Sequence, residues 1–306
     1  MNMSVNIGSI KLKNPIIAAS GTFGFGHEFS DYLDLNILGG ISGKGITKEP
    51  RTGNAPPRVA ETPSGMLNSV GLQNPGIEAY IREEIPFIRS FDIANIANVA
   101  GNTIEEYCWM AERLSCEDID AIELNVSCPN VKTGCLAFGS DAAELRELLK
   151  NVRKKCGKTL IIKLSPNVTD IGLMARICED EGADAVSLIN TILGMAIDAD
   201  TKTPILANNF GGLSGPCVKP VALRMVCQVY NTVRIPIIGM GGICGYRDAV
   251  EFMMAGATAC MVGTANFRHP GIIADIVKGL EQYMISENIE DINSLIGSLK
   301  LNRETQ

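Results

Sequence analysis

Residues 235–265 read IPIIGMGGICGYRDAVEFMMAGATACMVGTA, and this stretch carries the pattern that decides the fold. It begins with one short apolar run and closes on another, and a stretch of helical spacing lies between them. Each run is apolar at both odd and even positions, as is typical of parallel strands that are covered on both faces. The stretch therefore predicts a strand, a helix and a second strand in a βαβ unit.

The same alternation extends along nearly the whole chain. We expect eight strands, at residues 15–19, 37–41, 93–97, 121–125, 160–163, 185–189, 235–239 and 259–262. Helical spacing is clearest at residues 141–155, 169–181 and 216–232. Eight strands with intervening helices favour an α/β fold of the (β/α)8 or TIM-barrel type over a doubly wound sheet.

We expect residues 1–306 to form a single domain, because a barrel of this type forms around one core. Two segments exceed an ordinary connection, at about residues 50–76 after the second strand and residues 190–215 after the sixth. Both follow strands, so we expect them over the carboxyl-terminal face of the barrel, where active sites are built. Residues 4–12 have the pattern of a small hairpin that closes the opposite end.

Composition argues against several classes of protein. The 306 residues include 27 basic and 34 acidic side chains, which gives a net charge of −7 and an isoelectric point near 5.1. This balance, without a long basic run, argues against nucleic acid as a partner. No uncharged apolar stretch reaches the roughly 18 residues of a membrane span. The N-terminus lacks the pattern of a secretory signal, so we expect a cytoplasmic protein without a membrane segment.

The ten cysteines are expected to be thiols rather than metal ligands. No two of them have CxxC spacing, and the two histidines, His27 and His269, receive no role. Neither a zinc site nor a four-cysteine iron–sulfur cluster has its usual spacing. We therefore expect no metal site, and most of the cysteines should be small buried hydrophobic residues.

Two glycine-containing loops follow the last two strands. Gly241 and Gly242 follow the seventh strand, and Gly263 and Thr264 follow the eighth. Glycines at such positions let backbone amides approach a phosphate, so the two loops together predict a phosphate-bearing ligand. The alternative is that these glycines only make tight turns. The GxGxxG spacing of a dinucleotide-binding fingerprint is absent.

Lysine and amide side chains stand at the ends of other strands. Lys44 and Lys163 are candidates for balancing the charge of an anionic ligand, because a lysine in a strand is costly to bury without a partner. The alternative for each is a surface lysine whose stem alone is buried. Amide groups suit a planar heterocycle with carbonyl and N–H groups. The asparagines at predicted strand ends are Asn68, Asn98, Asn125 and Asn190, and the hydroxyl of Thr191 stands next to the last of them.

Cys128 lies in the segment ELNVSCPN, residues 123–130, after the fourth strand. We expect it in an exposed turn at the rim of the barrel. A thiol there can act as a nucleophile or a general base if its neighbours lower its pKa. A lone cysteine can equally be inert, so the residues alone leave both interpretations open. Cys135, on the same loop, is the less favoured candidate.

Taken together, these segments resemble the class 1 dihydroorotate dehydrogenases over nearly the whole chain. The resemblance is carried by the glycine loops and by GKGIT from Gly43, NSVGLQNPG from Asn68, ELNVSCPN from Glu123, IIKLSPN from Ile161 and GGLSGP from Gly211. VKTGCLAFG, residues 131–139, and NTILGMAID, residues 190–198, look like the NAD-linked class 1B rather than the fumarate-linked class 1A. Cys135 stands where we expect a second glycine in that subclass.

The resemblance implies one FMN per chain in the mouth of a TIM barrel. Gly241, Gly242, Gly263 and Thr264 would hold the phosphate of FMN. Lys163 would lie near the N1 and O2 edge of the flavin and stabilise the negative charge of the reduced ring. The implied cofactor site is completed by Ser20, Lys44, Gly45, Asn98, Asn125, Ile189 and Gly215.

The resemblance also implies the oxidation of dihydroorotate to orotate in pyrimidine biosynthesis. Cys128 would take a proton from C5 while hydride leaves C6 for N5 of the flavin. Oxidation of a saturated carbon–carbon bond next to a carbonyl requires such a base on one face and a hydride acceptor on the other. The implied substrate-binding residues are Lys44, Asn68, Ser69, Val70, Gly71, Leu72, Asn125, Asn130, Asn190 and Thr191.

Class 1B further implies a partner subunit that carries FAD and a 2Fe–2S cluster and reacts with NAD, in a heterotetramer built on a homodimer of the catalytic chain. A partner is also required because this sequence has neither a dinucleotide fingerprint nor an iron–sulfur cysteine cluster. The alternatives are a fumarate-using class 1A enzyme, a flavin-free phosphate-binding barrel with a catalytic cysteine, similar to IMP dehydrogenase, and a non-catalytic binding module.

Overall fold

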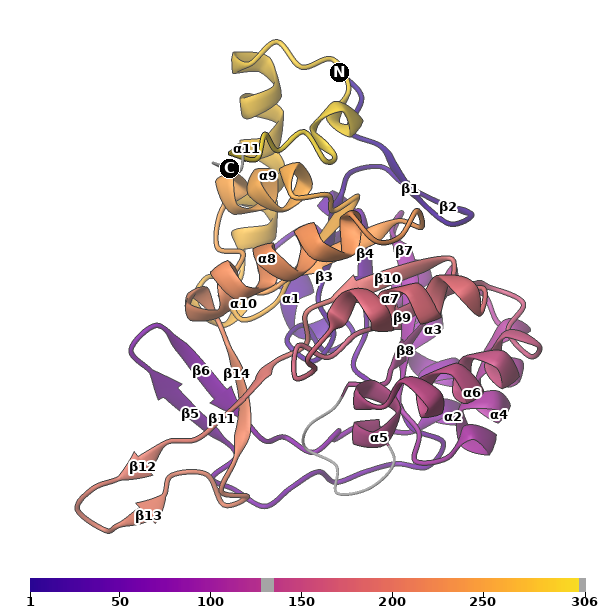
Figure 1. The fold of residues 1–306 in the computed structure, drawn as a ribbon, viewed down its shortest axis with the longest axis vertical. Coiled ribbons are helices and arrows are strands. Elements are labelled where there is room, and N and C mark those ends of the chain that lie inside the picture. Colours follow the sequence, from indigo (N-terminus) through magenta and orange to yellow (C-terminus); the bar gives the residue numbers. More distant parts are fainter. Residues whose placement is uncertain (128–134, 303–306) are drawn as a thin grey trace.

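The computed structural model describes residues 1–127 and 135–302. Within them, eight parallel strands close into a barrel (Figure 1), which confirms the predicted (β/α)8 architecture. In chain order the strands are β3 (Ile16–Ala18), β4 (Gly40–Ser42), β7 (Ala94–Val99), β8 (Ala121–Asn125), β9 (Thr159–Lys163), β10 (Ala185–Leu188), β15 (Ile237–Met240) and β16 (Ala259–Val262). Nearly every residue of these strands is buried, as expected for parallel strands that helices cover.

The second barrel strand begins later than the sequence pattern predicts. Residues 37–41 were the predicted range, but Leu35–Ile37 forms the 3₁₀ turn η1 and β4 begins at Gly40. Asp34 stabilises this turn, because its Oδ1 accepts a hydrogen bond from the backbone N–H of Asn36 at 3.0 Å. The prediction was therefore wrong in its boundary, since an apolar run before a glycine suits a turn as well as a strand.

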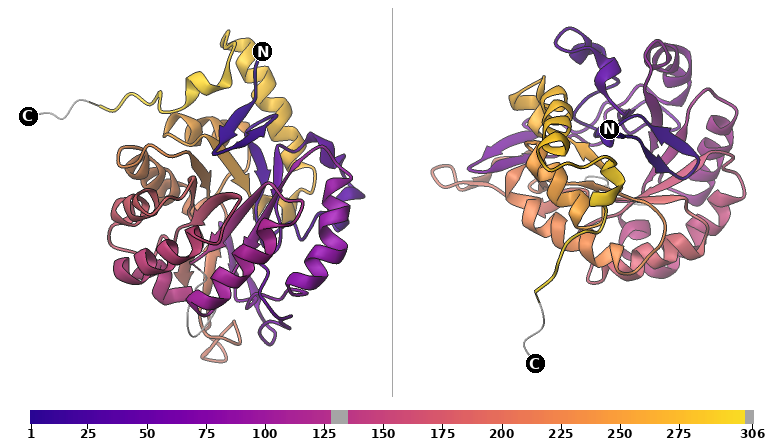
Figure 2. Two further views of the ribbon diagram at one scale, coloured as in Figure 1. Left: turned by 90° about the vertical axis from the view of Figure 1, so that its right-hand side faces the viewer. Right: turned by 90° about the horizontal axis from the view of Figure 1, so that it is seen from above.

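Helices surround the barrel in all three views of Figures 1 and 2. The longer ones are α4 (Ile104–Ser115), α6 (Ala142–Arg153), α7 (Ile171–Asp180), α8 (Lys219–Tyr230), α9 (Tyr246–Met254) and α11 (Ile272–Ser286). The shorter ones are α1 (His27–Ser30), α2 (Ile77–Ala79), the π-helix η2 (Tyr80–Glu84), α3 (Ile85–Arg89), α5 (Cys135–Ser140), η3 (Pro216–Val218), α10 (Ala265–Arg268) and η4 (Ile292–Leu295).

Helix α6 shows how the sequence specifies these elements. Its apolar side chains fall on one face and are buried, at Leu145, Leu148, Leu149 and Val152. Asp141 caps its first turn by accepting hydrogen bonds from the backbone N–H groups of Ala143 at 2.8 Å and Glu144 at 3.0 Å. The predicted helices at residues 141–155 and 169–181 are confirmed with slightly shorter ends, whereas residues 216–232 form η3 followed by α8.

The two long segments form a small antiparallel sheet at the carboxyl-terminal end of the barrel. The first supplies β5 (Val59–Thr62) and β6 (Gly65–Asn68), and the second supplies β11 (Ile192–Gly194) and β14 (Gly211–Ser214), in the spatial order β11-β14-β6-β5. Between β11 and β14, β12 (Ile197–Asp198) and β13 (Thr203–Pro204) form a hairpin that projects at the lower left of Figure 1. This sheet joins two segments that are far apart in the sequence.

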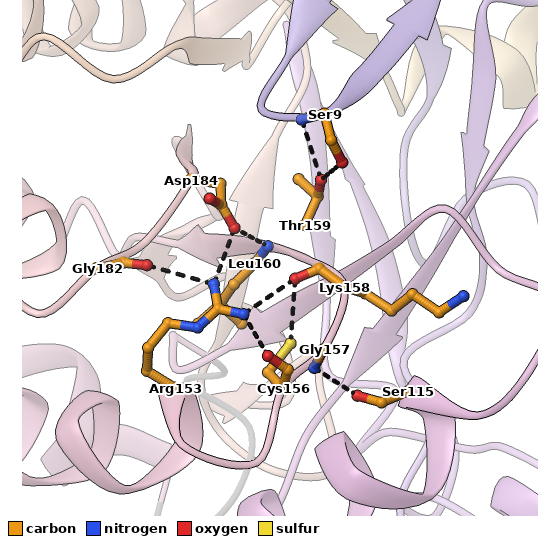
Figure 3. A network of polar contacts seen from close by, with 10 residues as sticks. All are labelled: Ser9, Ser115, Arg153, Cys156, Gly157, Lys158, Thr159, Leu160, Gly182 and Asp184. Carbon is orange, nitrogen blue, oxygen red and sulfur yellow. Dashed lines mark hydrogen bonds and ion pairs between the residues drawn. The ribbon is translucent and has the colours of Figure 1, made fainter.

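The predicted N-terminal hairpin is present as β1 (Val5–Ile7) and β2 (Ile10–Leu12). Figures 1 and 2 show it at the opposite end of the barrel from the antiparallel sheet. Ser9 in its turn fastens it to the start of β9, where the Ser9 and Thr159 hydroxyl oxygens lie 2.8 Å apart (Figure 3). Beside this contact, Arg153 donates a hydrogen bond to Asp184 at 2.9 Å, and Asp184 accepts another from the backbone N–H of Leu160. These bonds tie the hairpin, the end of α6 and the residue before β10 to the start of β9.

No helix in the described ranges has both the length and the apolar character needed to cross a membrane.

Candidate functional site

A cavity of about 390 Å³ lies at the carboxyl-terminal ends of the barrel strands. This volume is within the range of sites that bind small ligands and cofactors. Its walls are formed by residues at or just beyond the strand ends, such as Lys44 after β4, Ile189 after β10 and Gly241 after β15. The antiparallel sheet contributes Met66 and Leu213 to the same cavity.

Most of the site residues predicted from the sequence line this cavity. Those predicted for the substrate are Lys44, Asn68, Val70, Gly71, Leu72, Asn125, Asn190 and Thr191. Those predicted for the cofactor are Ser20, Lys44, Gly45, Asn125, Lys163, Ile189, Gly215, Gly241, Gly242, Gly263 and Thr264. The barrel thus brings together residues from nearly the whole length of the chain.

Four predicted site residues are not among those that line the cavity. Ser69 is fully buried behind the wall, where its carbonyl oxygen accepts a hydrogen bond from Nδ2 of Asn54 at 3.0 Å. Asn98 is buried behind Gly45, because a Cβ on Gly45 would lie 2.8 Å from Oδ1 of Asn98. Cys128 and Asn130 lie outside the described residues.

A hydrogen-bond network fixes the orientation of Asn125. Its Oδ1 accepts bonds from the backbone N–H of Ser127 at 3.3 Å and from the Ser127 hydroxyl at 3.1 Å. Asn190 reinforces this arrangement by donating from Nδ2 to Oγ of Ser127 at 2.7 Å. Because the oxygen of Asn125 is engaged in this way, its Nδ2 group is the part that can donate to a ligand in the cavity.

The sequence analysis did not identify Ser127, although it stands in the segment ELNVSCPN next to Cys128. The signal that could have indicated it was its position between the candidate residues Asn125 and Cys128.

The sequence analysis also did not identify the apolar side of the cavity, whose residues include Val59, Met66, Leu213, Met240, Met261 and Phe267. Apolar side chains of these types occur throughout the predicted core, so the sequence alone gives no signal that assigns these six to a cavity wall.

The first glycine loop can accept no side chain at Gly242. Its φ of +80° is a conformation that favours glycine, and a Cβ there would lie 2.8 Å from Cβ of Lys219 and 2.9 Å from the carbonyl oxygen of Gly215. Asp248 holds the loop by accepting a hydrogen bond from the backbone N–H of Cys244 at 2.8 Å. Lys219 in turn binds Asp248 at 2.6 Å, and this hydrogen bond raises the pKa of Lys219, so the lysine stays charged near neutral pH.

The two loops present backbone donors that the described residues leave unpaired. Within those residues, the N–H groups of Gly242, Gly263 and Thr264 have no hydrogen-bond acceptor. The Thr264 hydroxyl also donates to Oγ of Ser214 at 2.8 Å, which ties the second loop to the end of β14. Unpaired amides from two neighbouring loops form a suitable site for a phosphate group.

Lys163 is a buried cation at the end of β9. Only 5% of its surface is exposed, it lines the cavity, and no hydrogen bond or ion pair in the described ranges engages its ammonium group. A buried ammonium without a partner is unfavourable, so this position calls for a ligand with an electron-rich or anionic group.

Cys244 is the one cysteine within the described residues that lines the cavity. The surrounding protein raises the pKa of its thiol, chiefly by desolvation and further through the nearby Asp248 carboxylate. It is therefore a neutral thiol near pH 7 and a poor general base.

Comparison with known proteins gives consistent results. The family model described as "Dihydroorotate dehydrogenase" matches residues 2–284. The protein named "Dihydroorotate dehydrogenase B (NAD(+)), catalytic subunit" from Thermoanaerobacter pseudethanolicus is 57% identical over 301 residues, which cover 98% of this chain and 100% of that protein. Proteins of the same name from Alkaliphilus oremlandii and Citrifermentans bemidjiense are 56% and 52% identical, over 97% and 98% of this chain and 99% of each relative.

Proposed function

Because the chain belongs to the dihydroorotate dehydrogenase family, we propose that it oxidises dihydroorotate to orotate as the catalytic subunit of an NAD-linked enzyme of pyrimidine biosynthesis. One observation carries the proposal beyond the family name. Two glycine loops with free backbone donors, a buried lysine whose ammonium group has no partner within the described residues, and several amide side chains converge on one cavity. A redox cofactor with a phosphate tail and a flat polar substrate need this combination of groups.

FMN fits the groups that this cavity presents. The N–H groups of Gly242, Gly263 and Thr264, which have no acceptor among the residues that the structure describes, suit its phosphate. The ammonium group of Lys163 suits the electron-rich edge of its ring. When bound, FMN supplies the hydride acceptor of the reaction. The remaining residues that would hold it are Ser20, Lys44, Gly45, Asn98, Asn125, Ile189, Gly215 and Gly241.

The same cavity offers groups that suit dihydroorotate. Lys44 provides positive charge for the carboxylate, and Asn125 offers its Nδ2 group as a donor to a ring carbonyl. The fixed positions of these groups would orient the ring and exclude water from it. The other substrate residues are Asn68, Ser69, Val70, Gly71, Leu72, Asn130, Asn190 and Thr191.

We assign removal of the C5 proton to Cys128. A thiolate with a matched pKa is an effective base near neutral pH, and the resemblance of ELNVSCPN to the family segment supports this assignment. The raised pKa of Cys244 argues against that residue as the base.

We further propose that electrons reach NAD through a separate subunit that carries FAD and a 2Fe–2S cluster, in a cytoplasmic heterotetramer built on a homodimer of this chain. The words "catalytic subunit" in the names of the relatives support a partner. The purified chain should therefore oxidise dihydroorotate rapidly with an artificial dye acceptor but only slowly with NAD or fumarate, in steady-state assays of each acceptor. Efficient reduction of NAD by the chain alone would contradict the partner, and efficient reduction of fumarate would favour the class 1A alternative.

Gly212 is expected to position two substrate residues. It pairs with Asn68 on β6 and with Leu193 on β11, and Nδ2 of Asn68 donates to its carbonyl oxygen at 3.3 Å. A Cβ on Gly212 would lie only 2.0 Å from Oγ1 of Thr191, so alanine must displace that hydroxyl. We expect Gly212→Ala to raise the KM for dihydroorotate about tenfold, equivalent to about 1.4 kcal/mol of binding free energy, without weakening FMN binding.

The matched control for this variant is Gly245→Ala. Gly245 has an extended backbone, and a Cβ there would meet no atom within 4 Å. Its KM should stay at the wild-type value. A folded Gly212→Ala enzyme with an unchanged KM would show that Thr191 does not depend on this glycine.

A further inference from the structure

Asn74 is a buried amide side chain between two segments of the cavity wall, and it does not itself line the cavity. Its Oδ1 accepts hydrogen bonds from the backbone N–H groups of Thr47 at 3.1 Å and Gly76 at 2.9 Å. Its Nδ2 donates to the carbonyl oxygen of Leu72 at 2.7 Å and to Oγ1 of Thr47 at 2.9 Å. Leu72 lines the cavity, and Thr47 belongs to the segment after β4 that contributes Lys44 to it. One side chain therefore ties these two segments together.

The contacts of Asn74 determine which way its amide points. Backbone N–H groups can only donate, so the atom that faces Thr47 and Gly76 must be Oδ1, and the NH₂ group must face Leu72. Within the described ranges, Asn74 is the only donor to the carbonyl oxygen of Leu72. This hydrogen bond is therefore the direct link between Asn74 and the cavity wall.

Leu72 needs such a contact, because its backbone is strained. Its φ of +57° lies in the left-handed region, which is unfavourable for a residue with a side chain and persists only where neighbouring groups hold it. Gly71 has a φ of +75°, and we call Val70, Gly71 and Leu72 the 70–72 turn. The backbone N–H of Asn54 holds the first end of this turn by donating to the carbonyl oxygen of Val70 at 2.9 Å. Asn74 holds the strained end.

The 70–72 turn places three successive backbone donors at the cavity. The N–H groups of Val70, Gly71 and Leu72 have no acceptor in the part of the chain that the structure describes, and all three residues line the cavity. Successive N–H groups in a turn bind anions, and Lys44 adds a positive charge to the same cavity. The turn and Lys44 together suit the single carboxylate of dihydroorotate.

Lys44 is held in place without Asn74. Its backbone N–H donates to the carbonyl oxygen of Gly24 at 2.9 Å, and Ile46, two residues further on, pairs with Val99 at the end of β7. Loss of Asn74 should therefore shift the 70–72 turn relative to Lys44 and leave the FMN side of the cavity unchanged.

We propose that Asn74 is a positioning residue that fixes the 70–72 turn relative to Lys44, so that the site favours a substrate that carries a carboxylate. The inference rests on the proposed function, because it takes dihydroorotate to be the substrate. Asn74 touches neither FMN nor substrate. Its effect passes through the backbone of Leu72.

Asn74→Ala tests the proposal, because it removes the donor to Leu72 without adding a charge. We expect the KM for dihydroorotate and the dissociation constant of orotate to rise about tenfold, as when a charged ligand loses one hydrogen bond. The carboxylate takes no part in the bond changes, so kcat should change much less than KM. The affinity for FMN should stay at the wild-type value. Steady-state kinetics with a dye acceptor and calorimetric titration of the FMN-loaded enzyme with orotate measure these quantities.

Asn74→Ser is the second variant, in case alanine prevents folding. Its hydroxyl can still accept from the N–H of Gly76, two residues further on, but it is too short to reach the carbonyl oxygen of Leu72. It should raise KM in the same way as alanine.

Thr47→Val is the matched control. It removes a buried hydroxyl that bonds to Nδ2 of Asn74 and to the carbonyl oxygen of Glu49, but it keeps the backbone N–H of Thr47 and the bond from Asn74 to Leu72. It should lower the unfolding temperature and leave KM and orotate affinity unchanged. A purely structural role for Asn74 would give the two positions the same behaviour.

The outcomes separate this inference from the proposed function. Wild-type enzyme that does not oxidise dihydroorotate would overturn the proposed function itself. An active wild-type enzyme, together with a folded Asn74 variant of unchanged KM and orotate affinity, would overturn only the role of Asn74. An equal rise of KM in Thr47→Val would also overturn it, because the effect would then come from general loosening of this region. Thermal unfolding of each variant identifies those that fold.

Discussion

Replacement of Cys128 by alanine is expected to reduce turnover of dihydroorotate by about 10²–10⁴-fold, the usual contribution of a general base. FMN and orotate should still bind, because the variant removes only the group that takes the C5 proton. The loss should therefore appear in kcat rather than in KM. Rapid-mixing measurement of the rate at which dihydroorotate bleaches bound FMN tests this expectation without any electron acceptor.

Cys135→Ala is the control for that experiment, since it removes the other thiol of the same segment. It should retain most of the wild-type rate. Near-normal activity in Cys128→Ala, or a large loss in Cys135→Ala, would assign the base to a different residue.

The second large effect is expected for Lys163→Met. Its ammonium group is buried, lines the cavity and has no partner within the described residues, so a bound ligand gains a charge interaction that no other group replaces. Removal of one preorganised electrostatic group typically costs about 10²–10³-fold in rate. We expect a loss of that size in the reductive half-reaction, a weaker FMN complex and a lower midpoint potential of bound FMN.

Lys158→Met is the matched control, because Lys158 precedes the opposite end of the same strand, at the amino-terminal side of the barrel (Figure 3). Rate, FMN affinity and potential should all stay at wild-type values. An unchanged potential in Lys163→Met would show that its charge does not act on the cofactor.

The sequence pattern predicted the barrel well because each parallel strand is a short apolar run, and several of these runs are followed by a glycine, a lysine or an asparagine. Asn125, Lys163 and Gly263 were placed at one rim for that reason alone, since the carboxyl ends of parallel strands meet at the same face. The same reasoning could not place the start of β4, where an apolar run forms a turn instead.

The periodicity of the sequence could not predict which strands far apart in the chain pair with each other. The contact between β6 and β14 joins residues 68 and 212, and no local pattern indicates which two loops will pair. The hydrogen-bond network around Glu123, a buried residue of β8, shows the same limit. The glutamate was visible in ELNVSCPN, but its three donors come from β4, β7 and β10, and only the closed barrel brings them to one point.

The most direct test of the central claim is an absorption spectrum of the purified chain, followed by anaerobic addition of dihydroorotate. We predict a flavin band corresponding to one FMN per chain, which bleaches when dihydroorotate is added. A protein that remains colourless after FMN is supplied, or a flavin band that dihydroorotate does not bleach, would contradict the account.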